Sequence, residues 1–208
     1  MPTRRKLALI AVAAVIVLAV LTAQAGALRS LNFSPGGEIM ATGRWVITGG
    51  AAEFTANITL RGTIARAIAK RAGAHIGTIT GGAARECAVR RPAGWTCVYT
   101  TGPLVGETWD IAYSSFLGTL PTITGVLLTI NEETFLTSER EPLGRTIECL
   151  YKGRTAVLGR VNGERLLNEI TYLTGDSMPL FRILEGACPE SIGISGGWTF
   201  TTERVTLI

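Results

Sequence analysis

Apolar and polar residues alternate along much of this chain with a period of two. In the segment 54–61 every second residue is apolar, from Phe54 to Leu60, and the residues between them are polar. Residues 109–114 and 191–208 continue this alternation. Because successive side chains of a strand point to opposite faces, the pattern predicts strands with one buried face. With glycine at roughly every eighth to twelfth position, it indicates an all-β fold, an antiparallel sandwich or barrel of many short strands.

The expected strands lie between turn signals at glycine, proline and asparagine. They are 37–48, 52–61, 75–80, 85–90, 95–100, 107–116, 122–130, 133–137, 145–151, 154–161, 167–173, 179–185, 191–200 and 202–208. One segment departs from the pattern, because Ile64, Ile68 and Ala72 follow helical spacing and Gly73 comes directly after them. This spacing predicts one short helix over 63–72.

The first 27 residues have the layout of a secretory signal peptide. A positive head at residues 4–6 precedes an apolar run of 15 residues, and small residues follow it. The run is shorter than the roughly 20 residues of a membrane-spanning helix. Two A-x-A cleavage sites end at Ala25 and Ala27, and we favour the second. We then expect residues 28–208 to form a single secreted all-β domain. The alternative is that the N-terminal segment stays uncleaved and anchors the domain, and the protein would then contact the membrane only through this segment.

Removal of this leader changes the charge of the protein. The full chain has 20 basic and 16 acidic residues, and the leader takes Arg4, Arg5 and Lys6 with it, which leaves 17 against 16. A nucleic-acid-binding domain is strongly basic, so a net charge of +1 argues against that class of partner.

The four cysteines are Cys87, Cys97, Cys149 and Cys188. An even number in an exported chain indicates two disulfides. Of the three connectivities we favour Cys87–Cys97, placed symmetrically about the turn at Pro92, together with Cys149–Cys188. There is no C-x-x-C pair and only one histidine, His75, so we expect no metal site and no cofactor.

No motif for nucleophilic catalysis accompanies His75, and we expect no enzyme. Glycoside hydrolysis needs only two facing carboxyl groups. Asp110, Asp176, Glu132 and Glu133 are the acids considered for that role, and each is also typical of a strand end or turn.

Two features favour binding to a polymer or surface. Trp109 and Trp198 fall in phase with apolar neighbours and belong to the predicted core, whereas Trp95, beside the Pro92 turn, is the tryptophan most suited to stack on a sugar ring. The segment 61–91 holds seven basic residues and one acid.

Within that segment Arg66, Lys70, Arg90 and Arg91 are candidate contacts for an anionic wall polymer. Residues 132–148 hold five glutamates and two arginines, and the alternative interpretation is that the two segments neutralise each other.

The stretch from Trp109 to Gly125 resembles one found in a group of secreted proteins of high-GC Gram-positive bacteria. Their Gly-rich last strand and short terminus are similar to the stretch from Gly196-Gly197 through Val205-Thr206-Leu207 in this chain. The resemblance implies secretion and an all-β domain, and it implies no activity.

The sequence thus leaves three hypotheses for function. The first is a non-catalytic domain that binds cell-envelope polysaccharide or another anionic surface. The second is a structural protein that self-associates through edge strands, and the third, with least support, is a glycoside-hydrolase-like enzyme.

Overall fold

The computed structural model describes residues 30–34, 36–69, 71–103, 106–119, 122–164, 167–173, 175, 177–201 and 206–207. Over these residues the chain forms strands and no helix, which confirms the all-β prediction. The strands are β1 (Ser30–Ser34), β2 (Gly37–Gly49), β3 (Ala52–Ile64), β4 (Ala67–Ala69), β5 (His75–Arg91), β6 (Thr96–Thr101), β7 (Trp109–Thr119), β8 (Thr122–Arg140), β9 (Thr146–Val161), β10 (Leu167–Tyr172), β11 (Ser177–Glu185), β12 (Ser191–Phe200) and β13 (Thr206–Leu207). The expected leader, residues 1–27, lies outside the described residues.

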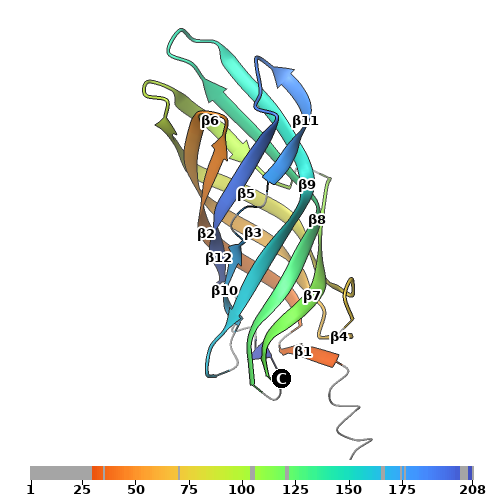
Figure 1. Cartoon of the computed structure of the whole chain (residues 1–208). Coiled ribbons are helices and arrows are strands. Elements are labelled where there is room, and N and C mark those ends of the chain that lie inside the picture. The colour runs from red at the N-terminus through yellow and green to blue at the C-terminus, as the bar shows by residue number, and fades with distance from the viewer. Residues whose placement is uncertain are drawn as a thin grey trace, which may run out of the picture.

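Ten strands form one antiparallel sheet that closes on itself as a barrel (Figure 1). Pairing runs from β2 through β3, β5, β7 and β8 to β9. On its other edge β9 pairs with β10 and β11, which both pair with β12, and β12 pairs with β2. The ten strands fill eight positions, because β6 and β7 lie end to end along β8, as β10 and β11 do along β9. The sequence predicted either a sandwich or a barrel, and this closed ring of strand pairings is a barrel.

Glycine allows the close approach that completes this ring. A Cβ atom at Gly43 in β2 would overlap the carbonyl oxygen of Gly197 in β12. Both residues lie where β2 pairs with β12, so the absence of side chains lets these strands come together.

Aromatic side chains fill the middle of the barrel, where eight strands leave an interior just wide enough for side chains. The ring of Trp45 lies 4.9 Å from that of Phe135 and 5.8 Å from that of Tyr172, measured between centroids. The rings of Trp109 and Trp198 each lie 6.3 Å from it. All five residues are buried, which confirms the prediction that Trp109 and Trp198 belong to the core. We call these five residues the aromatic cluster.

The prediction of a helix over 63–72 is wrong. β3 continues to Ile64, β4 begins at Ala67, and the chain bends and turns at 71–73. Ile64 and Ile68 are both buried, but strand pairing of β4 with β1 accounts for this segment rather than a helical turn. A helix of about ten residues is marginal without tertiary packing, so pairing with a distant strand overrides the local pattern.

Several strands are also longer than predicted. β5, β8 and β9 have 17, 19 and 16 residues, and the sequence pattern divided each of them in two. Gly81-Gly82 lies within β5 and not in a turn. Within β8 the register shifts between Ile130 and Glu133, and Glu132 has a φ of 54°. Such a bulge changes the phase of the alternation without ending the strand. The last expected strand, 202–208, lies largely outside the described residues.

The two ends of the barrel differ. At one end lie β11 and the turns between β5 and β6 and between β8 and β9, and at the other lie β1 and β4 (Figure 1). The two preferred disulfides are both present, with Cα–Cα distances of 5.6 Å for Cys87–Cys97 and 5.7 Å for Cys149–Cys188, as disulfide geometry requires. They link β5 to β6 and β9 to the β11–β12 loop, at the first end. Disulfides of this kind are typical of an oxidising, extracellular environment.

No helix in the described ranges is long and apolar enough to cross a membrane.

Candidate functional site

A cavity of about 260 Å³ opens at the β11 end of the barrel. The β2–β3 turn, the β5–β6 turn, β8, β9 and the β11–β12 loop all contribute to its wall. The lining residues are Gly49, Gly50, Ala51, Ala52, Phe54, Pro92, Trp95, Thr137, Glu139, Ile147, Cys149, Tyr151, Ala187, Cys188, Pro189 and Ile192. One water needs about 10–15 Å³, so the cavity has room for a small organic molecule. We call it the mouth cavity.

The wall of the mouth cavity is mostly apolar and carries three aromatic rings. Phe54 and Tyr151 are buried, and Trp95 is half-buried and packs against the core. Trp95 is thus the least buried of the four tryptophans, and it faces a cavity and not an open sheet surface.

The polar groups of the mouth cavity come chiefly from β8 and β9. Thr137 and Glu139 are inward-facing residues of β8, and Glu139 is only 7% exposed. Burial raises the pKa of the Glu139 carboxyl above its ordinary value. Burial raises the pKa of the Tyr151 phenol well above its ordinary value, and the nearby negative charge of Glu139 adds a smaller increase. Both shifts follow from the low polarity of the site.

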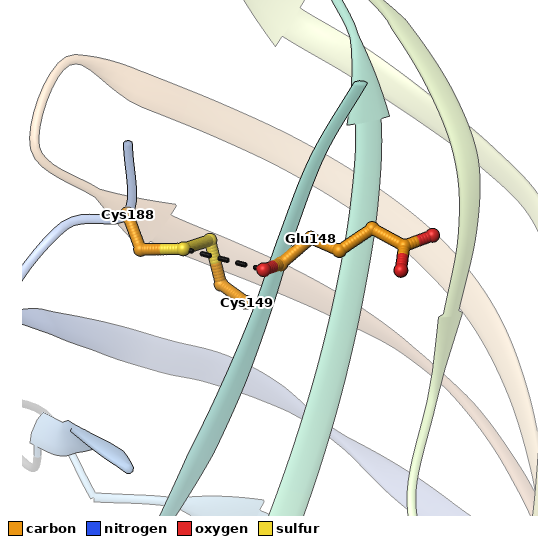
Figure 2. The surroundings of a disulfide bond; sticks show 3 residues. All are labelled: Glu148, Cys149 and Cys188. Carbon is orange, nitrogen blue, oxygen red and sulfur yellow. Dashed lines mark hydrogen bonds between the residues drawn. A yellow bond between two sulfur atoms is a disulfide. The ribbon is translucent and has the colours of Figure 1, made fainter. Parts of the chain in front are cut away.

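A disulfide holds one side of the cavity in place. Cys149 of β9 is buried, and its partner Cys188 lies in the β11–β12 loop, between Ala187 and Pro189 of the cavity wall. The Sγ atom of Cys188 also lies 3.4 Å from the carbonyl oxygen of Glu148, while the Glu148 carboxyl points away from the disulfide (Figure 2). The disulfide therefore ties the loop to β9 beside the cavity.

A second buried acid lies deeper in the barrel. Glu133 is fully buried and accepts hydrogen bonds from the hydroxyls of Thr155 and Tyr172. Burial, with the charge and hydrogen bond of Glu133, raises the pKa of Tyr172 well above its ordinary value. Along β8, Phe135 lies between Glu133 and the residues of the mouth cavity, so the aromatic cluster separates the two acids. Glu133 thus has protein partners, and it does not line the mouth cavity.

The candidate basic residues do not form one patch. Arg90 and Arg91 lie at the cavity end, and both pair with Glu53 of β3. Arg66 follows the far end of β3 and is exposed, so the 13 residues of β3 separate it from Arg91 by about 40 Å. Lys70 lies outside the described residues. The described ion pairs of Arg90 and Arg91 are with Glu53 and not with the acids of 132–148.

The acids considered for glycoside hydrolysis lie on different sides of the barrel wall. Asp110 is exposed, with its Oδ1 atom 4.0 Å from Nδ1 of His75, also exposed. Glu132 is exposed and Glu133 is buried inside. Asp176 falls outside the described residues. In the part of the chain that the structure describes, no group of three or more histidines, cysteines or acids is placed to hold a metal ion.

Glu139, Tyr151 and Phe54 form part of one site, and none of the three was predicted from the sequence as a site residue. One signal was present, because Thr137 and Glu139 continue the alternation of Phe135 toward the inside of the fold. An acid in phase with buried residues is unusual, since charged groups are seldom buried without a partner. The approach of β3, β8 and β9 around one cavity has no comparable signal in the sequence.

The mouth cavity has the chemistry of a small-molecule site, with an apolar wall and few polar groups. Its volume is somewhat below the roughly 300–1,000 Å³ of clefts that hold drug-sized molecules, so a smaller ligand fits it. No protein-family model matches this chain, and no curated protein or solved structure matches it. We therefore infer its function from the cavity itself.

Proposed function

We propose that this protein is a secreted, non-catalytic domain that binds a small, mostly apolar molecule in the mouth cavity. The single observation that carries the proposal is the open cavity of about 260 Å³, whose wall includes the aromatic residues Phe54, Trp95 and Tyr151. Secretion is supported by the leader-like residues 1–27 and by the two disulfides.

The shape of the barrel favours a site at this position. The aromatic cluster fills the middle of the barrel, whereas the mouth cavity stays open above it. At the opposite end the described cavity is only about 10 Å³, lined by aliphatic residues with Trp198 and Phe200. A ligand of more than one or two atoms therefore fits the mouth cavity and not that space.

This proposal changes the role of the residues that the sequence suggested. Trp95 stays a ligand contact, now for a molecule inside a cavity. Binding of a wall polymer across Arg66, Arg90 and Arg91 has less support, because about 40 Å of barrel separates the first from the other two. At physiological salt the screening length is about 8 Å, so Arg66 and Arg91 would not act together on the same charged group of a polymer.

Binding of 2-phenylethanol, followed by tryptophan fluorescence or by ligand-observed NMR, tests the proposal. We expect saturable binding to the oxidised mature domain. Ala187→Trp, which puts a large side chain into the cavity wall, should abolish it. Ala93→Trp, an exposed alanine outside the cavity lining, is the matched control and should leave binding unchanged. Absence of binding to the unmodified domain, or equal loss in both variants, would overturn the proposal.

A second candidate function, self-association, is favoured by one observation on β11. Phe181, Ile183 and Leu184 are 60%, 54% and 47% exposed. This part of β11 pairs with β9, while the register described with β12 ends at Pro179. An apolar strand with one free edge is a template for pairing with a second strand. We propose a second copy of this chain as the partner, with a test given in the Discussion.

A further inference from the structure

The mouth cavity contains one carboxyl group and no basic side chain. Glu139 is the single acidic residue among the lining residues, and neither lysine, arginine nor histidine is among them. None of the ion pairs in the described part of the chain involves Glu139. A buried carboxylate is stable only when a cation or hydrogen-bond donors compensate its charge. Glu139 therefore has an electrostatic requirement that a ligand can meet.

The aromatic rings of the cavity have the matching property. Phe54, Trp95 and Tyr151 line the cavity, and the electron-rich face of an aromatic ring attracts an organic cation within about 6 Å of the ring centre. A carboxylate and three aromatic rings in one cavity thus both favour positive charge, while the aliphatic residues Ile147 and Ile192 accept an apolar body. An anionic ligand, in contrast, would place its charge next to Glu139 in a site of low polarity.

Basic residues near the rim do not reverse this preference. Arg90 and Arg91 both pair with Glu53, whose side chain is only 17% exposed. Arg145 of the β8–β9 connection pairs with Glu141, with 2.8 Å between Nη2 and Oε2. Glu53 and Glu141 thus hold these three arginines outside the cavity and compensate two of their charges, whereas the Glu139 charge lies inside it.

We propose that the ligand of the mouth cavity is an organic ammonium: an apolar, ring-sized body with one cationic nitrogen directed at the Glu139 carboxyl. This inference rests on the proposed function, since it needs the mouth cavity to be a binding site. It adds the chemical class of the ligand and assigns Glu139 as the specificity-determining residue. Phe54, Trp95 and Tyr151 surround the cationic group and the body.

Three probes with the same phenylethyl body test this class: 2-phenylethylammonium, 2-phenylethanol and 3-phenylpropanoate. At pH 7 we expect the ammonium to bind at least about tenfold more tightly than the alcohol, as a charge-assisted hydrogen bond implies. The carboxylate should bind most weakly. Titration of the full oxidised domain by ligand-observed NMR measures all three affinities.

Glu139→Gln assigns the preference to this carboxyl. In this variant the ammonium should lose its advantage of about tenfold over the alcohol, with both affinities measured on the same variant. Glu141→Gln removes one acidic charge outside the cavity lining and is the matched control, with all three affinities unchanged.

The two proposals fail in different ways. If no probe binds the unmodified domain, the mouth cavity is not a binding site and the proposed function is overturned. If the alcohol binds and the ammonium binds no more tightly, or if Glu139→Gln keeps the preference for the ammonium, only the ligand class is overturned.

Discussion

Glu132 and Glu133 are adjacent in the chain and lie on opposite sides of the barrel wall. Glu132 is exposed, with its Oε2 atom 2.5 Å from Nζ of Lys152, whereas Glu133 is fully buried and accepts hydrogen bonds from Thr155 and Tyr172. The positive φ of Glu132, 54°, belongs to the bulge that turns the next side chain inward. One residue of extra chain thus decides which acid is inside, and the same shift directs Glu139 into the mouth cavity.

Glu133→Ala should lower the free energy of unfolding by about 2–4 kcal/mol. The substitution leaves the buried hydroxyls of Thr155 and Tyr172 without their acceptor and creates a cavity. Urea denaturation followed by tryptophan fluorescence measures the change. Glu132→Ala is the matched control and should cost under about 1 kcal/mol, because it removes an exposed ion pair. Similar losses in the two variants would contradict the assigned burial.

Glu139→Gln should stabilise the ligand-free protein at neutral pH. Burial raises the Glu139 pKa above its ordinary value of 4.5, so the folded state holds this proton more tightly than the unfolded chain does. Stability contributed by Glu139 is therefore lost as pH rises from about 4.5 through the raised pKa, and it stays lost above that pH. The glutamine variant does not titrate and avoids this loss.

The gain in Tm from Glu139→Gln should accordingly be largest at pH 7 and disappear at pH 4. Thermal unfolding of both proteins across this range measures it. A Tm difference that does not change with pH would show that burial does not perturb this carboxyl.

Replacement of both Cys149 and Cys188 by serine should cost about 4 kcal/mol. The chain-entropy model gives this value for their separation of 39 residues, and about 3 kcal/mol for the separation of 10 residues in Cys87–Cys97. Because Cys188 also holds the cavity wall, loss of this disulfide should weaken binding of 2-phenylethanol as well. The double serine variant at Cys87 and Cys97 serves as the comparison, and a larger stability loss there would contradict the expected order.

Phe181→Lys should weaken self-association without affecting the fold. Phe181 is 60% exposed on the free part of β11, so a charge there interferes with edge pairing while the stability of the monomer changes by under about 0.5 kcal/mol. Sedimentation velocity over a range of concentrations measures the oligomeric state. Leu143→Lys, at a residue 88% exposed in the β8–β9 turn, is the control. A monomer at all concentrations of the unmodified protein would exclude this second function.

The alternation of side chains was sufficient to predict the fold class, most strand positions and the burial of Trp109 and Trp198. It was not sufficient at Gly81-Gly82, where a strand continues through residues that usually mark turns, or at Glu132, where a bulge changes the phase of the alternation without ending the strand. It also failed over 63–72, because β4 is stabilised by pairing with β1, whose partner residues lie 35 to 39 positions away along the chain. Local patterns carry no information on such distant partners.

The sequence by itself determined that this chain is all-β, that its cysteines suit two disulfides, and that Trp95 differs from the other tryptophans. Those conclusions depend on neighbouring residues, through the period of two and the spacing along the chain. Only the tertiary structure decided that the sheet closes, that Arg66 and Arg91 lie at opposite ends of it, and that Glu139 meets Phe54 and Tyr151 in one cavity. Closure and the cavity depend on registers between strands far apart in sequence, and one bulge at Glu132 is enough to exchange the inner and outer faces of a strand.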